Sequence, residues 1–379
     1  MQRTICSLTI LLVFFPLIHA SATSIEDRLK ALEARLSQLA EENASLKKQI
    51  GFDAKDIVPT YVTAAGNEQK LSIGGYLQAN AEAGDAPDAR FPTDSRFIIR
   101  RARITLKGSF TEKFDFLFQS DFGNNAVGGV AGYRAQITDL AITWRNYEHA
   151  QVTMGQFKTP YGYEQLLADT KTLTVERSAS NDFLTLSRQI GAMVSGSILE
   201  KRVTYWAGLF NGNGVNQGHN DNDQFLYVGR LAGTAVRNNH LTLNLATNAF
   251  TTKDTGANFT GTRNGIGLDA QASMGPAGLY AEWFQTHFDR AIGPSTDARG
   301  WSLLGTWMLV PKALQAVLRY ETIDPNRAAA NDDTHIWTIG ANYFVKGDDL
   351  KLSINYLLGD PAGPLSDQGR LLGRMQVIF

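Results

Sequence analysis

The sequence predicts an all-β fold: a transmembrane antiparallel β-barrel of about sixteen strands, preceded by an N-terminal α-helical coiled coil. Two observations support the barrel. Segments of about ten residues alternate apolar and polar side chains along most of the chain, so each strand would have one apolar and one polar face. After the N-terminus, no apolar run reaches the ~20 residues that a membrane-spanning helix needs. A closed sheet pairs every backbone N–H and C=O group, which allows it to cross a bilayer.

Residues 1–22 have the composition of a secretory signal peptide. Arg3 provides a positive charge, residues 8–18 are almost wholly apolar, and Ala20-Ser21-Ala22 offers a small-residue cleavage site. Cleavage would remove Cys6, the only cysteine, so the mature chain could form neither a disulfide framework nor a cysteine-based metal site.

Residues 23–50 are predicted to form a coiled-coil helix, followed by a linker over residues 51–70. Apolar residues recur there in alternating steps of four and three, and Asn43 occupies the one core position that lacks an apolar residue. A coil implies self-association. The alternative is a single amphipathic helix that lies on the barrel.

The barrel is predicted over residues 71–379. Its candidate strands are 71–83, 101–110, 114–122, 135–145, 150–158, 188–199, 202–210, 224–233, 240–250, 265–274, 277–289, 299–310, 314–323, 334–345, 350–358 and 369–379. With about sixteen strands the interior is too wide for side chains to fill, so a water channel is expected.

The last strand shows the expected alternation most clearly. Its apolar row ends in Phe379, while Arg374 and Gln376 fall on the opposite face, as suits lipid outside and water inside. A terminal aromatic residue on such a strand resembles the C-terminal signature of bacterial outer-membrane β-barrels. Phe379 is therefore the expected barrel-assembly signal.

Residues 159–187 form a long connection without strand alternation. Long connections in compact structures are usually functional or disordered. Because this one contains Leu166, Leu173 and Phe183, it is too apolar for an exposed tip. We expect it to fold inward as a constriction loop.

Several motifs resemble the phosphate-selective porin O and P family. They are the run Arg100-Arg101-Ala102-Arg103 in residues 97–106, the segments 113–116 and 121–123, Gly155-Gln156-Phe157-Lys158-Thr159-Pro160-Tyr161-Gly162-Tyr163-Glu164, Glu176-Arg177-Ser178 and Ile190-Gly191. The resemblance implies a trimeric sixteen-stranded barrel with an anion-selective pore in the bacterial outer membrane, with the N-terminal coil in the periplasm.

The expected anion pathway combines this resemblance with strand alternation. Its candidate residues are Arg100, Arg101, Arg103, Asp139, Lys171 and Arg177. Further basic residues fall on the predicted lumen faces of strands: Lys107, Arg230, Arg319 and Arg374. Two other interpretations stay open: the strand arginines could form an ordinary solvated face, and Arg177 could pair with Asp139 or Glu176 and pin the loop.

The chain departs from the family pattern at three positions. It has Gln165, Asp115 and Tyr76 where phosphate channels of the family carry basic residues. The resemblance therefore implies an anion channel whose phosphate selectivity is weak.

Charge and motif content limit the other functions. Lys+Arg number 36 and Asp+Glu 37, a balance that does not suggest nucleic-acid binding. The histidines show no paired metal-ligand spacing, and the oxygen-rich segment 211–223 matches no EF-hand, so no cofactor or metal is expected. The expected partners are outer-membrane lipid, small anions, further copies of the chain and the barrel-assembly machinery.

Three alternatives to a selective channel stay open. A weakly selective general porin and a structural tether that uses the coil both fit the same barrel. A barrel enzyme could combine His287, Asp289 and serines near Ser178 in a catalytic site. However, no Gly-X-Ser-X-Gly motif is present, and no enzymatic activity is expected.

Overall fold

The computed structural model describes residues 61–63, 70–86, 88, 90–91, 95–124, 133–147, 149–255, 259–361 and 369–379, together with Lys30, Ala34, Arg35 and Gln38. The chain divides into two units, residues 1–58 and 59–379. In the first unit the four described residues are helical. The predicted signal peptide, most of the predicted coiled coil and nearly all of the linker lie outside the described residues. Among the described residues, no helix is long and apolar enough to cross a membrane.

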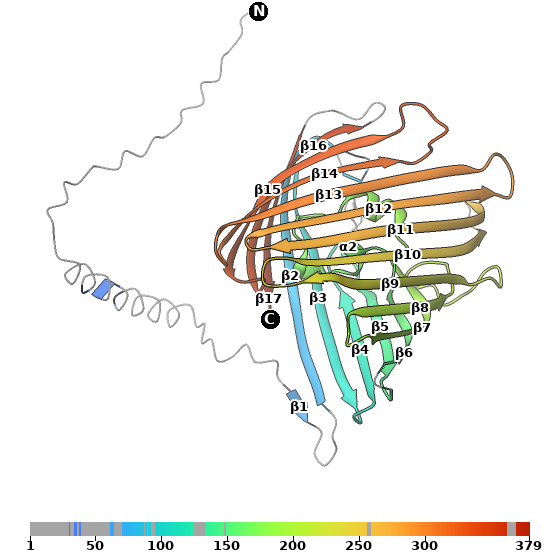
Figure 1. Ribbon diagram of the computed structural model, residues 1–379, viewed down its shortest axis with the longest axis horizontal. Coiled ribbons are helices and arrows are strands. Elements are labelled where there is room, and N and C mark those ends of the chain that lie inside the picture. The colour runs from blue at the N-terminus through green and yellow to red at the C-terminus, as the bar shows by residue number, and fades with distance from the viewer. Residues whose placement is uncertain are drawn as a thin grey trace, which may run out of the picture. The chain divides into compact units, whose positions relative to one another are not determined.

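The second unit is a closed antiparallel barrel (Figure 1). The strands are β1 (Tyr61–Thr63), β2 (Lys70–Gly84), β3 (Arg96–Phe110), β4 (Phe114–Asp121), β5 (Gln136–Trp144), β6 (Gln151–Lys158), β7 (Arg188–Ile198), β8 (Val203–Phe210), β9 (Leu226–Arg237), β10 (Thr242–Thr255), β11 (Thr260–Met274), β12 (Ala277–Arg290), β13 (Thr296–Val310), β14 (Leu314–Asp324), β15 (Thr334–Lys346), β16 (Leu350–Pro361) and β17 (Arg370–Ile378). From β2 onward each strand pairs with the next, and β17 pairs with β2, which closes the ring. β1 pairs with the start of β2.

The sixteen segments predicted from alternation correspond one to one with β2 to β17, which confirms the barrel prediction. Several strands extend beyond their predicted ends. β3 and β11 begin five residues earlier than expected, and β10 ends five residues later. These extensions contain polar residues, such as the run Thr251–Thr255, that carry no apolar alternation.

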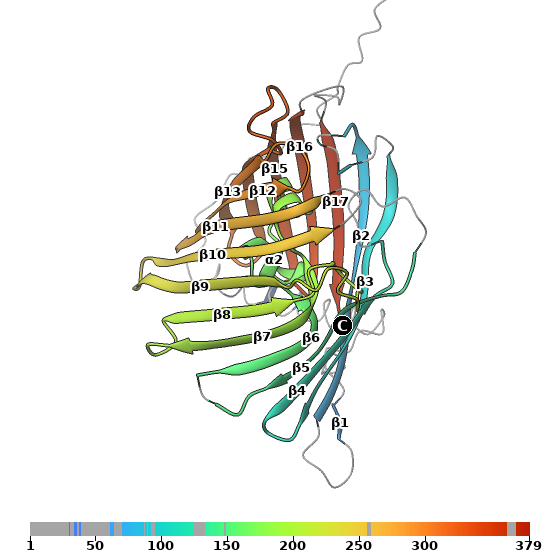
Figure 2. The same ribbon diagram turned by 90° about the vertical axis from the view of Figure 1, so that its right-hand side faces the viewer.

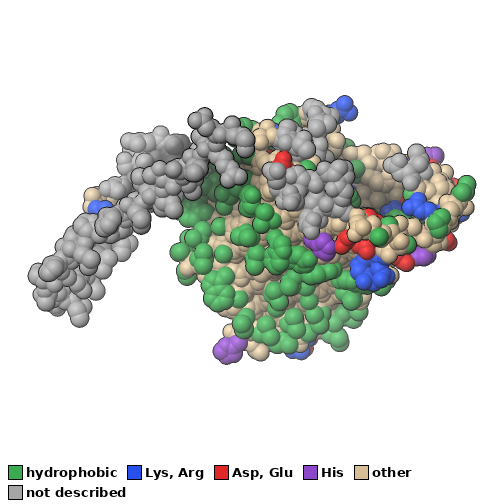
Figure 3. Space-filling model, turned by 90° about the horizontal axis from the view of Figure 1, so that it is seen from above, with side chains coloured by type: hydrophobic (Ala, Val, Ile, Leu, Met, Phe, Trp, Pro, Cys, Tyr) green, Lys and Arg blue, Asp and Glu red, His purple; other side chains and the backbone are tan. Residues whose placement is uncertain are grey.

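The two faces of the strands differ as the sequence predicts. In β17, Leu371 and Met375 are exposed on the outer wall, whereas Arg374 and Gln376 are buried inside the barrel. Apolar side chains cover much of the outer wall (Figure 3). The buried side chains include many polar and charged ones from the inner face, so the barrel has a polar interior and an apolar exterior.

The connections at the two ends of the barrel differ in length. At one end β3 and β4, β11 and β12, β13 and β14, and β15 and β16 are joined by two or three residues. At the other end the connections include the long segments 159–187 and 211–225. We call these the short-turn end and the long-loop end. In outer-membrane barrels, short turns face the periplasm and longer loops face the exterior.

Candidate functional site

Residues 159–187 fold into the barrel. The segment carries the short helices α2 (Tyr163–Leu166) and α3 (Ala179–Leu184) and the 3-10 turn η1 (Asp169–Lys171). Figures 1 and 2 both show the green segment with α2 inside the ring of strands. Its contacts with side chains of many strands, given below, hold it there.

The first part of the loop is held by β10 and β12. The Gly162 amide donates to Oδ1 of Asn248 at 2.9 Å, and the amides of Tyr163 and Glu164 donate to the carboxylate of Glu282 at 2.5 and 3.1 Å. The positive φ of Gly162, 83°, allows the sharp change of direction before α2. These bonds satisfy amides at the helix N-terminus that would otherwise lack partners.

The tip of the loop reaches the short-turn end of the barrel. Nζ of Lys171 lies 2.7 Å from Oδ2 of Asp348, in the turn between β15 and β16. Nζ of Lys351 donates to the carbonyls of Thr170 and Thr172 at 3.0 and 3.1 Å. The loop therefore starts at the long-loop end and passes most of the length of the barrel.

The returning part is held by β14 and β16. The Val175 amide donates to Oδ1 of Asn355 at 2.6 Å, and the Ala179 amide donates to Oε2 of Glu321 at 2.6 Å. Nη1 of Arg319 donates to the carbonyl of Glu176 at 3.0 Å. The inner faces of the strands thus supply side-chain partners for the loop backbone, which explains how an irregular segment is tolerated inside the barrel.

Two loop carboxylates attract arginines from three parts of the chain. Asp169 pairs with Nη2 of Arg177 at 2.7 Å, with Nη1 of Arg103, and with Nε of Arg101 at 3.7 Å. Glu176 accepts two bonds from Arg100, at 2.9 and 3.0 Å, and one from Nη2 of Arg374 at 2.5 Å. We call Arg100, Arg101, Arg103, Arg177 and Arg374 the arginine cluster.

A β-bulge explains why consecutive arginines join the same cluster. Gln78 of β2 pairs with Arg101, but the next residue, Ala79, pairs with Ile99, so Arg100 is the extra residue. Strict alternation would place Arg100 and Arg101 on opposite faces. The bulge allows both side chains to be buried within the barrel.

The cluster carries excess positive charge. Its five guanidinium groups face the carboxylates of Asp169 and Glu176, and Arg103 also pairs with Asp121 at 2.7 Å. Burial would raise the pKa of Asp169, but Arg177 and the neighbouring strand arginines hold it well below its usual value. Burial also acts to raise the pKa of Glu176, and the guanidinium groups around it lower that pKa far more. Both carboxylates are therefore ionised at neutral pH.

The other predicted site residues lie elsewhere. Asp139 pairs with Arg188 at 2.9 Å and does not contact Arg177. Arg230 pairs with Asp269 at 2.5 Å. Lys107 is exposed on β3. Among the predicted site residues, the structure brings together the members of the arginine cluster and places Arg319 beside them. Four others lie apart from the cluster: Asp139, Lys107, Arg230 and Lys171 at the loop tip.

Sequence reasoning missed three basic residues that contact the loop or its base. Nη1 of Arg90 bonds to Asp182 at 2.7 Å and to the carbonyl of Arg177 at 3.0 Å. Arg188 begins β7, immediately after the loop, and Nζ of Lys158 donates to the carbonyl of Leu167 at 2.8 Å. Lys158 and Arg188 directly flank the loop in the sequence, and this position could have identified them as candidate site residues.

The residues weighed for other chemistry have different partners from those an enzyme would need. Nδ1 of His287 lies 2.9 Å from Asp297, while the Ser178 hydroxyl donates to Glu164 at 2.7 Å. In the described parts of the chain, no group of three or more His, Cys, Asp or Glu residues could hold a metal ion.

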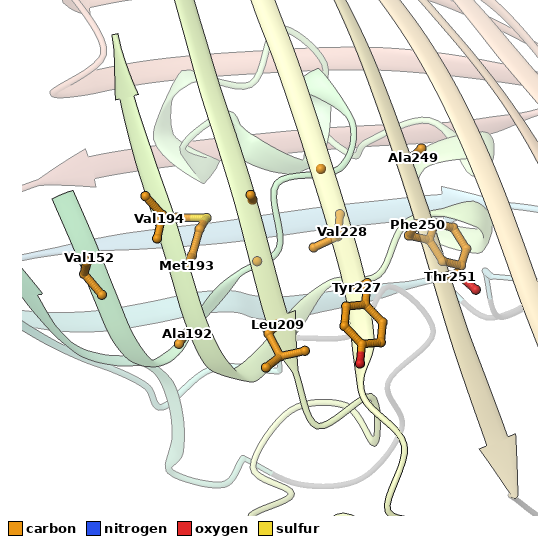
Figure 4. A pocket seen from close by; sticks show the side chains of 13 residues that line it. Val152, Ala192, Met193, Val194, Leu209, Tyr227, Val228, Ala249, Phe250 and Thr251 are labelled. Atoms are coloured by element: carbon orange, nitrogen blue, oxygen red, sulfur yellow. The ribbon is translucent and has the colours of Figure 1, made fainter. Parts of the chain in front are cut away.

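An apolar hollow of about 750 Å³ lies along the wall of β6 to β10 (Figure 4). Small and aliphatic side chains such as Ala192, Val194, Leu209 and Val228 line it, and no residue of the arginine cluster does. The hollow therefore does not belong to the charged site.

Comparison with known proteins gives a family and several similar folds. A family model described as phosphate-selective porin O and P matches residues 71–251 and 227–377. A search of curated proteins finds no match. The barrel is similar to an anion-selective porin from Comamonas acidovorans, with 16% identity, a TM-score of 0.59, and coverage of 82% of this chain and 100% of that chain.

Two further solved structures show the same likeness. The outer-membrane channel DcaP of Acinetobacter baumannii has 13% identity and a TM-score of 0.62, over 85% of this chain and 100% of that chain. A trimer form of OmpT from Vibrio cholerae has 11% identity and a TM-score of 0.55, over 82% of this chain and 99% of that chain. At such identities these structures establish the fold alone.

Proposed function

From the premise that the chain belongs to the phosphate-selective porin O and P family, we propose that this outer-membrane porin passes small anions in preference to cations. The observation that carries the proposal is the excess of arginine over carboxylate within the arginine cluster. Five guanidinium groups face Asp169, Glu176 and Asp121 inside the barrel. A positive field beside a narrow path raises the local concentration of anions and lowers that of cations.

We propose that the attraction is shallow and that phosphate is selected only weakly. An anion about 4 Å from one guanidinium gains about 4 kcal/mol at an effective dielectric constant near 20. Binding at the millimolar level corresponds to about the same free energy, so one or two unbalanced charges attract an anion and still release it.

The three departures from the family pattern support this weak selectivity. The Tyr76 hydroxyl donates to Asp169, the carboxylate of Asp115 accepts from Arg145 and Ser109, and Gln165 is a buried neutral side chain. None of these positions supplies a positive charge for a multivalent anion.

Planar-bilayer recording of the purified protein tests the proposal. In a tenfold KCl gradient, the zero-current potential should have the sign of the chloride equilibrium potential. The sign of the potassium equilibrium potential would refute anion preference. Adding phosphate should reduce chloride current only at about millimolar concentrations, and block at micromolar phosphate would refute the shallow attraction.

We also propose that the protein is a trimer whose N-terminal coil, residues 23–50, lies in the periplasm after removal of residues 1–22. The heptad spacing of the sequence supports self-association. The trimer form of the structurally similar Vibrio cholerae OmpT supports the oligomer number. Deleting residues 25–50 should leave conductance intact, because the barrel alone carries the path. A tether would instead lose its role in the cell envelope.

A further inference from the structure

Lys158 has an environment unlike that of the arginine cluster. It ends β6, one residue before the loop, and its Nζ donates to the carbonyl of Leu167 at 2.8 Å. Nη2 of Arg177 donates to the same carbonyl at 2.9 Å. Two cations from different segments therefore meet at one neutral acceptor.

The partners of the two kinds of cation differ in charge. Every arginine of the cluster pairs with a carboxylate. Among the described residues, the hydrogen-bond partner of Lys158 is a carbonyl, which reduces its charge less than an ion pair would. An ammonium group has three N–H donors, and the Leu167 carbonyl takes one of them. Lys158 is half-buried, so part of the residue remains exposed.

The surroundings of Lys158 add to its positive field. Arg188 is its register partner on β7, and Arg177 shares its acceptor. The two nearby carboxylates are already engaged, since Asp139 pairs with Arg188 and Asp169 is divided among the arginines of the cluster. At the base of the constriction loop, a permeating anion would thus meet a lysine that is not paired with a carboxylate.

We propose that Lys158 supplies the charge that contacts the permeating anion, whereas the arginine cluster chiefly holds the loop in place. The ligand is a small anion such as chloride or a monovalent oxyanion. A compact ammonium group suits such an ion, because it offers a point charge and no bidentate fork that would favour tight binding of phosphate. The inference rests on the proposed anion channel and names the residue that gives it selectivity.

A charge-tagging experiment tests this role. Since Cys6 is the only cysteine in the sequence, Lys158→Cys in a Cys6→Ser background provides a unique thiol. The full-length channel is reconstituted in planar bilayers and modified with thiosulfonate reagents that add a positive aminoethyl, a neutral methyl or a negative sulfonatoethyl group. The chloride-to-potassium permeability ratio is read from the zero-current potential.

The ratio should follow the sign of the added charge. The neutral adduct should lower the ratio about threefold to tenfold relative to the unsubstituted channel, the change expected for losing one partly screened charge near the path. The positive adduct should restore it, and the negative adduct should lower it further. Equal ratios for all three adducts would overturn the proposal. A residue that only supports the loop at Leu167 would affect selectivity in the same way whatever the charge of the adduct.

A matched control uses Lys113, an exposed cation in the turn between β3 and β4 at the short-turn end. Adducts at Lys113→Cys should change the ratio less than twofold, and effects as large as those at position 158 would overturn the assignment to Lys158. Should the cysteine variant not assemble, Lys158→Arg should keep the selectivity and Lys158→Gln should lose it; equal selectivity in both would refute the role. An unsubstituted channel that prefers potassium would instead refute the proposed function itself.

Discussion

Replacing Glu176 by glutamine should loosen the constriction loop and strengthen anion preference together. Glu176 is the loop carboxylate that joins β3 to β17, because it accepts bonds from Arg100 and from Arg374. The substitution keeps the shape of the side chain but removes its charge. Both arginines would then be buried beside a neutral amide, with side-chain exposures of 4% and 2%.

The magnitude follows from the burial of these groups. Removing one partner of a buried ion pair costs about 3–5 kcal/mol, because the remaining charge is left uncompensated. The loop has other anchors, such as the bond from Val175 to Asn355, so this loss should favour local detachment and leave the barrel folded. A change of about 3 kcal/mol raises the detached population about a hundredfold.

Single-channel recording and thermal unfolding measure the two consequences. Glu176→Gln should raise the mean conductance or its fluctuations, because a detached loop obstructs the lumen less. It should also raise the chloride-to-potassium permeability ratio, since the cluster keeps five arginines and loses one carboxylate. Glu200→Gln, an exposed change in the turn at 199–202, is the control and should alter neither property. If Glu176→Gln left conductance and selectivity at their original values, the assigned role of the loop network would be refuted.

Three further predictions follow from other contacts of the loop and the barrel. The pKa values of Asp169 and Glu176 are lower in the folded loop than in the unfolded chain, where a carboxyl pKa is about 4. Their ion pairs therefore stabilise the loop at any pH above about 4, and this stabilisation is lost only as the pH falls through the lower folded pKa values. The ion pairs of Asp169 and Glu176 should therefore stay intact from pH 7 to pH 4, and titration of either carboxylate between pH 6 and pH 5, followed by infrared spectroscopy, would contradict this. Lys171→Gln should release the loop tip from Asp348. The loss of stability should be less than about 1 kcal/mol, because the lysine side chain is 58% exposed. Current noise should rise while the melting temperature shifts little, and a large drop in melting temperature would argue against a local contact. Deleting Phe379, whose amide and carbonyl bond to β2, should reduce assembled barrel several-fold as judged by the heat-modifiable band on gels, whereas equal assembly would exclude it as an assembly signal.

The barrel could be predicted from the sequence because its physical cause is local. A strand between lipid and water must alternate apolar and polar residues. This alternation can be recognised in each segment without knowledge of its neighbours in the sheet. The extensions at the long-loop end were missed for the same reason. Thr251–Thr255 continues β10 with polar residues on both faces, and only its pairing with β11 makes it a strand.

The partners of the candidate site could not be predicted, because they depend on contacts between distant parts of the chain. Arg103 and Asp169 are 66 residues apart, and Arg374 and Glu176 are 198 apart. Alternation indicated that these arginines face the lumen, but it could not show that loop carboxylates reach them. The bulge at Arg100 adds a second limit, since one extra residue reverses the face that the pattern assigns.

The number of basic residues in a pore-lining sequence is therefore a poor guide to the electrostatic field in the pore. A guanidinium group that pairs with a buried carboxylate contributes mainly to holding the loop, because the pair presents little net charge at a distance. What a passing ion meets is the remainder after pairing. In this barrel the remainder includes the excess of the arginine cluster and, by our proposal, Lys158, whose acceptor is the Leu167 carbonyl rather than a carboxylate. Selectivity should accordingly respond more to changes at this lysine than to the loss of an arginine whose partner is removed with it.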